Sequence, residues 1–122
     1  TGLFDVMAHL DLIKKFGYRS NLDLNSMYTE LAGVLTEADV CIEISSGGLR
    51  QPVTEIYPIP ELLRACQAAG VPVTLGSDSH KPEHVGYAFP QLVDTLRNAG
   101  YQQIVRFTDR KRSFYPLPHL AK

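Results

Sequence analysis

Six consecutive residues, Leu75-Gly76-Ser77-Asp78-Ser79-His80, place a carboxylate and an imidazole two positions apart. Asp and His side chains are both ligands for divalent cations such as zinc and manganese. The apolar run at 71–75 predicts a short buried strand, and active sites of parallel α/β proteins lie just beyond such strands. The alternative is a polar turn in which Ser77 or Asp78 caps a helix and His80 lies in solvent, and the hexapeptide alone does not decide between the two.

Two more polar segments follow predicted strands. His9 and Asp11 come after an apolar run at 3–8. A lone histidine in this position is more often a hydrogen-bonded structural residue than a ligand. Glu43 lies inside an apolar run and should face the side opposite to its two isoleucine neighbours. A carboxylate facing a barrel interior is costly unless it is paired or binds a cation, whereas on an edge strand Glu43 would simply face water.

Arg50 ends a Ser-Ser-Gly-Gly-Leu-Arg turn after the second predicted strand. Adjacent glycines permit backbone conformations closed to other residues and a close approach to a ligand. A guanidinium matches phosphate oxygens bidentately, so Arg50 is a candidate phosphate-binding residue. The turn fits neither the Walker nor the dinucleotide glycine pattern, and an arginine in such a turn, taken alone, is more often a solvated loop residue than a ligand-binding one.

Hydrophobic periodicity predicts the elements that hold these residues. Strands alternate with helices, which favours a parallel sheet with right-handed crossovers. The carboxyl ends of parallel strands share one rim, so the polar segments should converge on one cleft. The predicted strands are 3–8, 40–44, 71–75 and 103–107, and the predicted helices are 25–38, 60–70 and 88–99.

Composition limits the classes of protein that fit. A chain of 122 residues with 44% hydrophobic residues, 20% charged residues and a net charge of −1 predicts one globular domain with no general attraction to nucleic acid or membranes. No apolar run approaches a membrane helix in length. Cys41 and Cys66 lack a CxxC partner, which favours buried, reduced thiols in a cytoplasmic protein. The basic residues after 105 should form a solvated tail, and His84 and His119 should be surface residues.

Four segments together resemble the polymerase-and-histidinol-phosphatase (PHP) superfamily of metal-dependent phosphoesterases, in particular its histidinol-phosphatase branch. The segment around Asp78 and His80 is the most specific of them. The likeness spans nearly the whole chain and is carried by residues 7–17, 41–50, 55–58 and 76–86.

The resemblance implies a distorted seven-stranded α/β barrel with divalent metals at its C-terminal rim. Residues 1–122 would be the C-terminal portion of such a domain, a partial barrel of about four parallel strands and three main helices. The family's opening His-x-His motif has no match here, so residues before Thr1 are expected to be missing. The resemblance also assigns roles: His9, Asp78 and His80 bind metal, Asp78 and His80 are catalytic, Arg50 binds phosphate, and Asp11 and Glu43 support the ligands.

The implied reaction is hydrolysis of L-histidinol phosphate to histidinol and phosphate in histidine biosynthesis. Several zinc, manganese or iron ions would activate the attacking water and stabilise the charge on the phosphoryl oxygens. Three candidate ligands are too few for a multinuclear site, so the chain alone should bind metal weakly and turn over little substrate.

The expected partner is a small phosphorylated substrate, with neither nucleic acid nor membrane, and the open edges of a half-barrel invite self-association. Two other interpretations stay open. One is a related phosphoesterase acting on nucleotides or nucleic acid, which the near-neutral charge disfavours. The other is a truncated, non-catalytic binding or assembly module.

Overall fold

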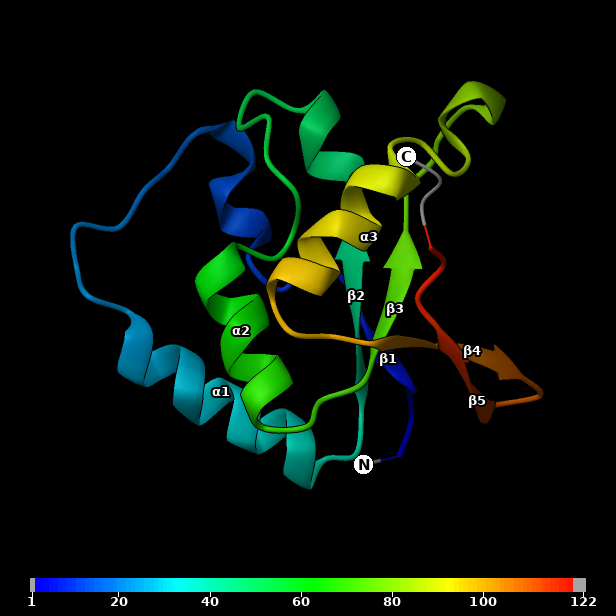
Figure 1. The fold of residues 1–122 in the computed structure, drawn as a ribbon. Coiled ribbons are helices and arrows are strands. Elements are labelled where there is room, and N and C mark those ends of the chain that lie inside the picture. The colour runs from blue at the N-terminus through cyan, green and yellow to red at the C-terminus, as the bar shows by residue number, and fades with distance from the viewer. Residues whose placement is uncertain (1, 120–122) are drawn as a thin grey trace.

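The computed structural model of the chain describes residues 2–119. A three-stranded parallel sheet in chain order, β1-β2-β3, forms its centre (Figure 1). One helix connects each pair of successive strands and a third follows the last strand, which confirms the predicted alternation up to that point. The elements are β1 (Val6–Met7), α1 (Asn25–Glu37), β2 (Cys41–Ser45), α2 (Pro60–Ala68), β3 (Val73–Gly76) and α3 (Phe89–Asn98).

The hydrophobic core lies between one face of the sheet and the three helices (Figure 1). Ile42 and Ile44 of β2 are fully buried there, and the register places Val73 of β3 beside Ile42. Each helix buries apolar residues of one face, although Met27 and Val34 of α1 are exposed. The buried helical residues are Ala32, Leu35, Leu62, Leu63, Cys66, Leu92, Val93 and Leu96.

The local sequence accounts for both ends of α2. Pro60 opens α2 with Glu61 in the first turn, and Gly70 follows it with φ of 77°. At the start of α1, neither Asn25 nor Ser26 makes a capping hydrogen bond through its side chain. The Asp23 carboxylate, two residues earlier, accepts a hydrogen bond from the Asn25 backbone N–H at 3.0 Å instead.

The prediction of a fourth parallel strand is wrong. β4 (Gln103–Thr108) pairs antiparallel with β5 (Lys111–Pro116), and the two form a hairpin beside the sheet (Figure 1). Asp109 and Arg110 connect the strands with positive φ values of 49° and 63°. Two residues with positive φ make a turn whose twist suits a hairpin. Asp-Arg is not a common pair in such turns, so the local residues did not indicate a hairpin.

The predicted solvated basic tail is therefore mostly a strand. Arg110 pairs with Asp5 at 2.7 Å, and Arg112 pairs with Asp39 at 2.8 Å. Both carboxylates lie just before strands of the parallel sheet, so the ion pairs hold the hairpin against its amino-terminal end. Residues 120–122 of that tail lie outside the described part of the chain.

β2 is the central strand, with β1 on one side and β3 on the other. This rules out the interpretation of Glu43 as an edge-strand residue facing water. The first strand is shorter than the predicted 3–8 and pairs only through Val6 and Met7. Within residues 2–119 the parallel sheet has three strands rather than about four, and it is open.

The two cysteines are free and buried, as predicted. Burial raises the pKa of Cys41 to about 12 and that of Cys66 to about 11, so both thiols are protonated and unreactive at neutral pH. None of the helices between residues 2 and 119 combines the length and apolar character that crossing a membrane would require.

Candidate active site

The candidate residues gather at the carboxyl end of the parallel sheet, the upper end in Figure 1. His9 follows β1, Arg50 ends the short helical turn after β2, and Asp78 and His80 follow β3. Because parallel strands share one direction, their ends meet on one rim. This end of the sheet is where the sequence predicted a cleft.

Glu43 lies on the sheet face opposite the helical core, and its carboxylate packs against Gly76, where any β-carbon would overlap it. Its Oε1 is buried and has no hydrogen-bond partner among the described residues. Burial raises the pKa of Glu43; the nearby His9 lowers this pKa and the Asp78 charge raises it. Glu43, His9 and Asp78 therefore lie close enough to interact electrostatically.

Asp78 adopts a left-handed backbone conformation, with φ of 47°, directly after β3. A β-carbon at Gly47 would lie 2.7 Å from the β-carbon of Asp78. The glycine pair does allow a close approach, but the group that approaches is the side chain of Asp78, and the predicted approach of a ligand stays a prediction. Gly47 is required for space and not for an unusual conformation, since its φ is not positive.

Arg50 holds the turn that carries Asp78. Its Nη2 donates hydrogen bonds to the backbone oxygens of Ser77 at 2.7 Å and Asp78 at 2.9 Å. The guanidinium carbon lies 5.4 Å from the centre of the Tyr87 ring. Its other terminal nitrogen, Nη1, is buried and has no partner among the described residues. The fork is therefore fixed in direction and keeps one nitrogen for a ligand.

His80 is exposed, and its Nδ1 lies 2.9 Å from the backbone oxygen of Asp78. In the part of the chain that the structure describes, no group of three or more His, Cys, Asp or Glu side chains is arranged to hold a metal ion. Metal binding by His9, Asp78 and His80 therefore stays a prediction.

Asp11 is bound to a lysine that the sequence analysis missed. Its Oδ2 accepts a hydrogen bond from the Ile59 backbone N–H at 2.7 Å and lies 3.0 Å from Lys14 Nζ. Lys14 is only 4% exposed, and Nζ also lies 3.3 Å from Glu55 and donates to the Ile56 backbone oxygen at 2.9 Å. Asp11 and Lys14 thus anchor the 51–59 loop to the segment after β1. A lysine in a basic loop gave no sign of burial.

Tyr57 is the other residue that the sequence analysis missed. It is 1% exposed, and its backbone forms both hydrogen bonds of an antiparallel bridge with Ser45 at the end of β2. The His9 ring meets its ring edge to face at 6.5 Å. Burial, then the charges of Asp11 and Asp78, raise the pKa of Tyr57. Its hydroxyl is buried without a partner among the described residues.

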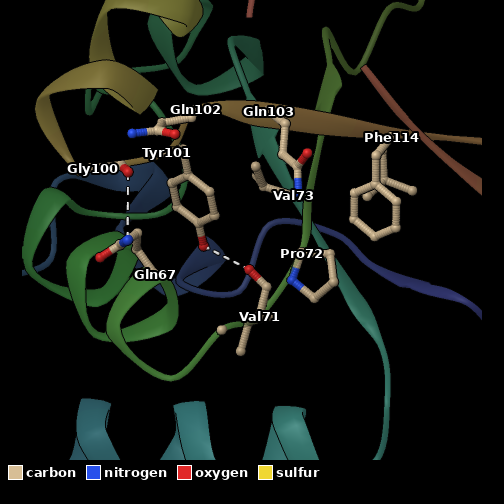
Figure 2. A pocket seen from close by; sticks show the side chains of 11 residues that line it. Gln67, Val71, Pro72, Val73, Gly100, Tyr101, Gln102, Gln103 and Phe114 are labelled. Atoms are coloured by element: carbon tan, nitrogen blue, oxygen red, sulfur yellow. Dashed lines mark hydrogen bonds between the residues drawn. The ribbon is translucent and has the colours of Figure 1, made fainter. Parts of the chain in front are cut away.

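A cavity of about 580 Å³ lies elsewhere, between β3, the hairpin and the end of α2 (Figure 2). Tyr101 donates its hydroxyl proton to the Val71 backbone oxygen at 2.9 Å, and Gln67 donates to the Gly100 oxygen at 3.4 Å (Figure 2). Its lining contains no carboxylate, imidazole, thiol or cationic side chain. The cavity therefore lacks the groups that acid–base or metal chemistry requires.

No family model matches the chain. Over 112 residues it is 41% identical to a protein of Deinococcus radiodurans described as a probable histidinol-phosphatase. The match covers 91% of this chain and 42% of the relative, so the chain spans about two fifths of the relative's length. The comparison establishes a similarity to part of a histidinol-phosphatase-like protein.

Proposed function

We propose that this chain forms part of a metal-dependent phosphomonoesterase that hydrolyses L-histidinol phosphate to histidinol and phosphate, as in histidine biosynthesis. One observation carries the proposal: the 41% identity over 112 residues with a probable histidinol-phosphatase. The polar rim at the carboxyl end of the sheet supports it. There, buried groups of both signs lack partners within the described chain.

The side chains at this rim fit divalent cations in chemical type. An imidazole and two carboxylates, those of His9, Glu43 and Asp78, interact electrostatically, and one carboxylate oxygen of Glu43 is buried without a partner. A cation would satisfy that oxygen and offset the cost of its burial. We propose His9, Asp78 and His80 as ligands, with Glu43 behind them. Bound zinc, manganese or iron ions would supply Lewis-acid stabilisation and an activated water.

The chain's own residues would bind and orient the phosphate. Arg50 is fixed by two backbone carbonyls, so its buried Nη1 is directed in advance toward a phosphoryl oxygen. The charge of the guanidinium would stabilise the phosphoryl oxygens as negative charge grows on them. Because Nδ1 of His80 faces the Asp78 backbone oxygen, its exposed ring has one free nitrogen, Nε2. That nitrogen would either bind a metal ion or, when protonated, donate a proton to the departing alkoxide oxygen of histidinol.

A second function is a non-catalytic binding or assembly module. Two observations favour it: the chain spans only 42% of its relative, and within residues 2–119 no three ligand side chains form a metal site. We therefore propose that the chain alone has little activity. Self-association through the outer edges of β1 and β3, and a cytoplasmic location, stay predictions.

The test has two arms. In the first, Mn²⁺ is titrated into the chain and into Asp78→Asn and His9→Gln, and binding is followed by the electron paramagnetic resonance of free Mn²⁺. In the second, this chain replaces the matching stretch of the Deinococcus protein, and the graft is assayed for phosphate release from L-histidinol phosphate and from a nucleoside monophosphate.

We expect weak Mn²⁺ binding that both substitutions remove, and a graft that prefers histidinol phosphate. A graft that folds but releases no phosphate, beside an active parent, would contradict the catalytic proposal and favour the module. A graft that prefers the nucleoside monophosphate would indicate a phosphoesterase that acts on nucleotides and not on histidinol phosphate.

A further inference from the structure

Tyr57 is held in place by a backbone bridge and by close packing of its ring. Its N–H donates to the Ser45 backbone oxygen at 3.0 Å, and its own backbone oxygen accepts from the Ser45 N–H at 2.8 Å. On one side the ring packs against Gly48, where a β-carbon would lie 3.0 Å from two ring carbons. Gly48 belongs to the same turn as Arg50, so the ring and the guanidinium are positioned by one segment.

The rest of the ring faces the polar rim. The Tyr57 and His9 rings meet edge to face, with their centres 6.5 Å apart. Lys14 Nζ lies 5.4 Å from the centre of the Tyr57 ring. Lys14 is itself held by Asp11 at 3.0 Å. Tyr57 is therefore packed among the residues of the candidate active site and not in the helical core.

The hydroxyl is the unusual part of this side chain. Although Tyr57 is 1% exposed, its oxygen has no hydrogen-bond partner in the described chain. A buried hydroxyl without a partner destabilises the fold, and a phenylalanine would avoid that cost. A neutral phenol has one proton to donate, and its hydrogen bond is strongest when the acceptor is a negatively charged oxygen.

We propose that Tyr57 is a further substrate-binding residue, whose hydroxyl donates a hydrogen bond to a phosphoryl oxygen of the phosphomonoester that Arg50 also binds. This inference rests on the proposed function and deepens it, because it adds the neutral donor Tyr57 to the cationic donor Arg50 in the phosphate site. Arg50 would provide the positive charge, and Tyr57 a hydrogen bond of fixed direction, since the His9 ring, the close packing against Gly48 and the backbone bridge to Ser45 fix where the Tyr57 ring lies.

The experiment measures binding and stability in parallel. Inorganic phosphate is titrated by calorimetry, at fixed ionic strength, into the 122-residue chain in the presence of excess Mn²⁺, and the melting temperature is measured without phosphate. The variant is Tyr57→Phe. The matched control is Tyr101→Phe, which removes a partly buried hydroxyl that does have a partner, the Val71 oxygen at 2.9 Å. Arg50→Gln serves as the reference for lost phosphate binding.

We expect Tyr57→Phe to weaken phosphate binding roughly tenfold and to leave the melting temperature unchanged or higher. The variant lacks one charge-assisted hydrogen bond in the phosphate complex, but it lacks none in the folded chain without phosphate. Tyr101→Phe should do the reverse, with a lower melting temperature and unchanged phosphate binding.

Three results would overturn the inference. If Tyr57→Phe binds phosphate as tightly as the unmodified chain while Arg50→Gln does not, the inference fails alone and the proposed function stands. If Tyr57→Phe melts as far below the unmodified chain as Tyr101→Phe does, the hydroxyl has a structural role. If the unmodified chain binds no phosphate at millimolar concentration, the proposed phosphate site fails together with the inference.

Discussion

The two ends of the parallel sheet differ in whether their polar side chains have hydrogen-bond partners. At the amino end, the partly buried Tyr101 and Gln67 and the exposed Thr36 all donate to backbone oxygens across the cavity or between helices. At the carboxyl end, buried polar atoms lack partners within the described chain. They are Asp11 Oδ1, Glu43 Oε1, Ser46 Oγ, Arg50 Nη1 and Tyr57 Oη.

The difference bears on function because an unsatisfied buried polar atom destabilises the fold. A protein whose only requirement was stability would pair such atoms, as the amino end does, or replace them by apolar ones. Their concentration at one end of the sheet fits a region shaped for charged ligands. Cavity volume alone points to the other end of the sheet, because the 580 Å³ cavity lies where polar groups are already paired.

The largest effect should come from Arg50. In the graft described above, Arg50→Ala should lower the rate of histidinol phosphate hydrolysis by roughly a thousandfold, as for other arginines that stabilise a transferring phosphoryl group. Arg50→Lys should restore little, because a point charge does not reproduce the fork. Arg106→Ala, on an exposed residue of the hairpin, is the control. Equal losses in both variants would remove Arg50 from the site.

Lys14 provides the next test, because it is the buried charge at the carboxyl end that does have partners. Lys14→Met should lower the free energy of unfolding by about 3 kcal/mol, since Asp11 loses its cation in a buried setting. Chemical denaturation measures this change. Lys111→Met, on the exposed face of the hairpin, should leave stability nearly unchanged. A Lys14 effect as small as the control would show that the network contributes little.

A smaller effect is expected at the amino end. Tyr101→Phe should lower the free energy of unfolding by about 1 kcal/mol, the usual worth of one intramolecular hydrogen bond. Tyr57→Phe should not lower it, although Tyr57 is the more buried of the two. Denaturation curves of the two variants compare the ends directly. Equal destabilisation would erase the contrast between them.

The smallest effect concerns Glu43 and depends on pH. Burial raises the pKa of Glu43 in the fold above its value in the unfolded chain, which is about 4.3. The chain is therefore most stable with respect to Glu43 below about pH 4.3, where this acid is protonated in both states. That stability is lost as pH rises through the folded pKa. Glu43→Gln should therefore stabilise the chain by roughly 0.5–1 kcal/mol at pH 7 and by almost nothing at pH 4.

Thermal melts at both pH values measure this gain, and Glu37→Gln at the exposed end of α1 is the control. A destabilised Glu43→Gln at pH 7, without added metal, would mean that the ionised carboxylate has a stabilising partner in the fold.

Local sequence was enough for α2, whose proline, acidic first turn and closing glycine all act within one or two turns of the helix. It was also enough to place His9, Arg50 and Asp78 after strands. It did not reveal that Lys14 and Tyr57 are buried at the site. Both are buried by contacts with residues 42 and 12 positions away, Ile56 and Ser45, and no local pattern encodes such contacts.

The sequence by itself determined where the three helices and strands β2 to β4 form and which end of the parallel strands carries polar residues, because periodicity and capping act between near neighbours. Only the tertiary structure decided which strands pair. It placed Glu43 on a central strand, turned the last predicted strand into half of a hairpin, and brought Tyr57 to Ser45. Strand pairing joins residues distant in sequence through backbone groups that every residue carries, so side-chain pattern alone cannot specify it.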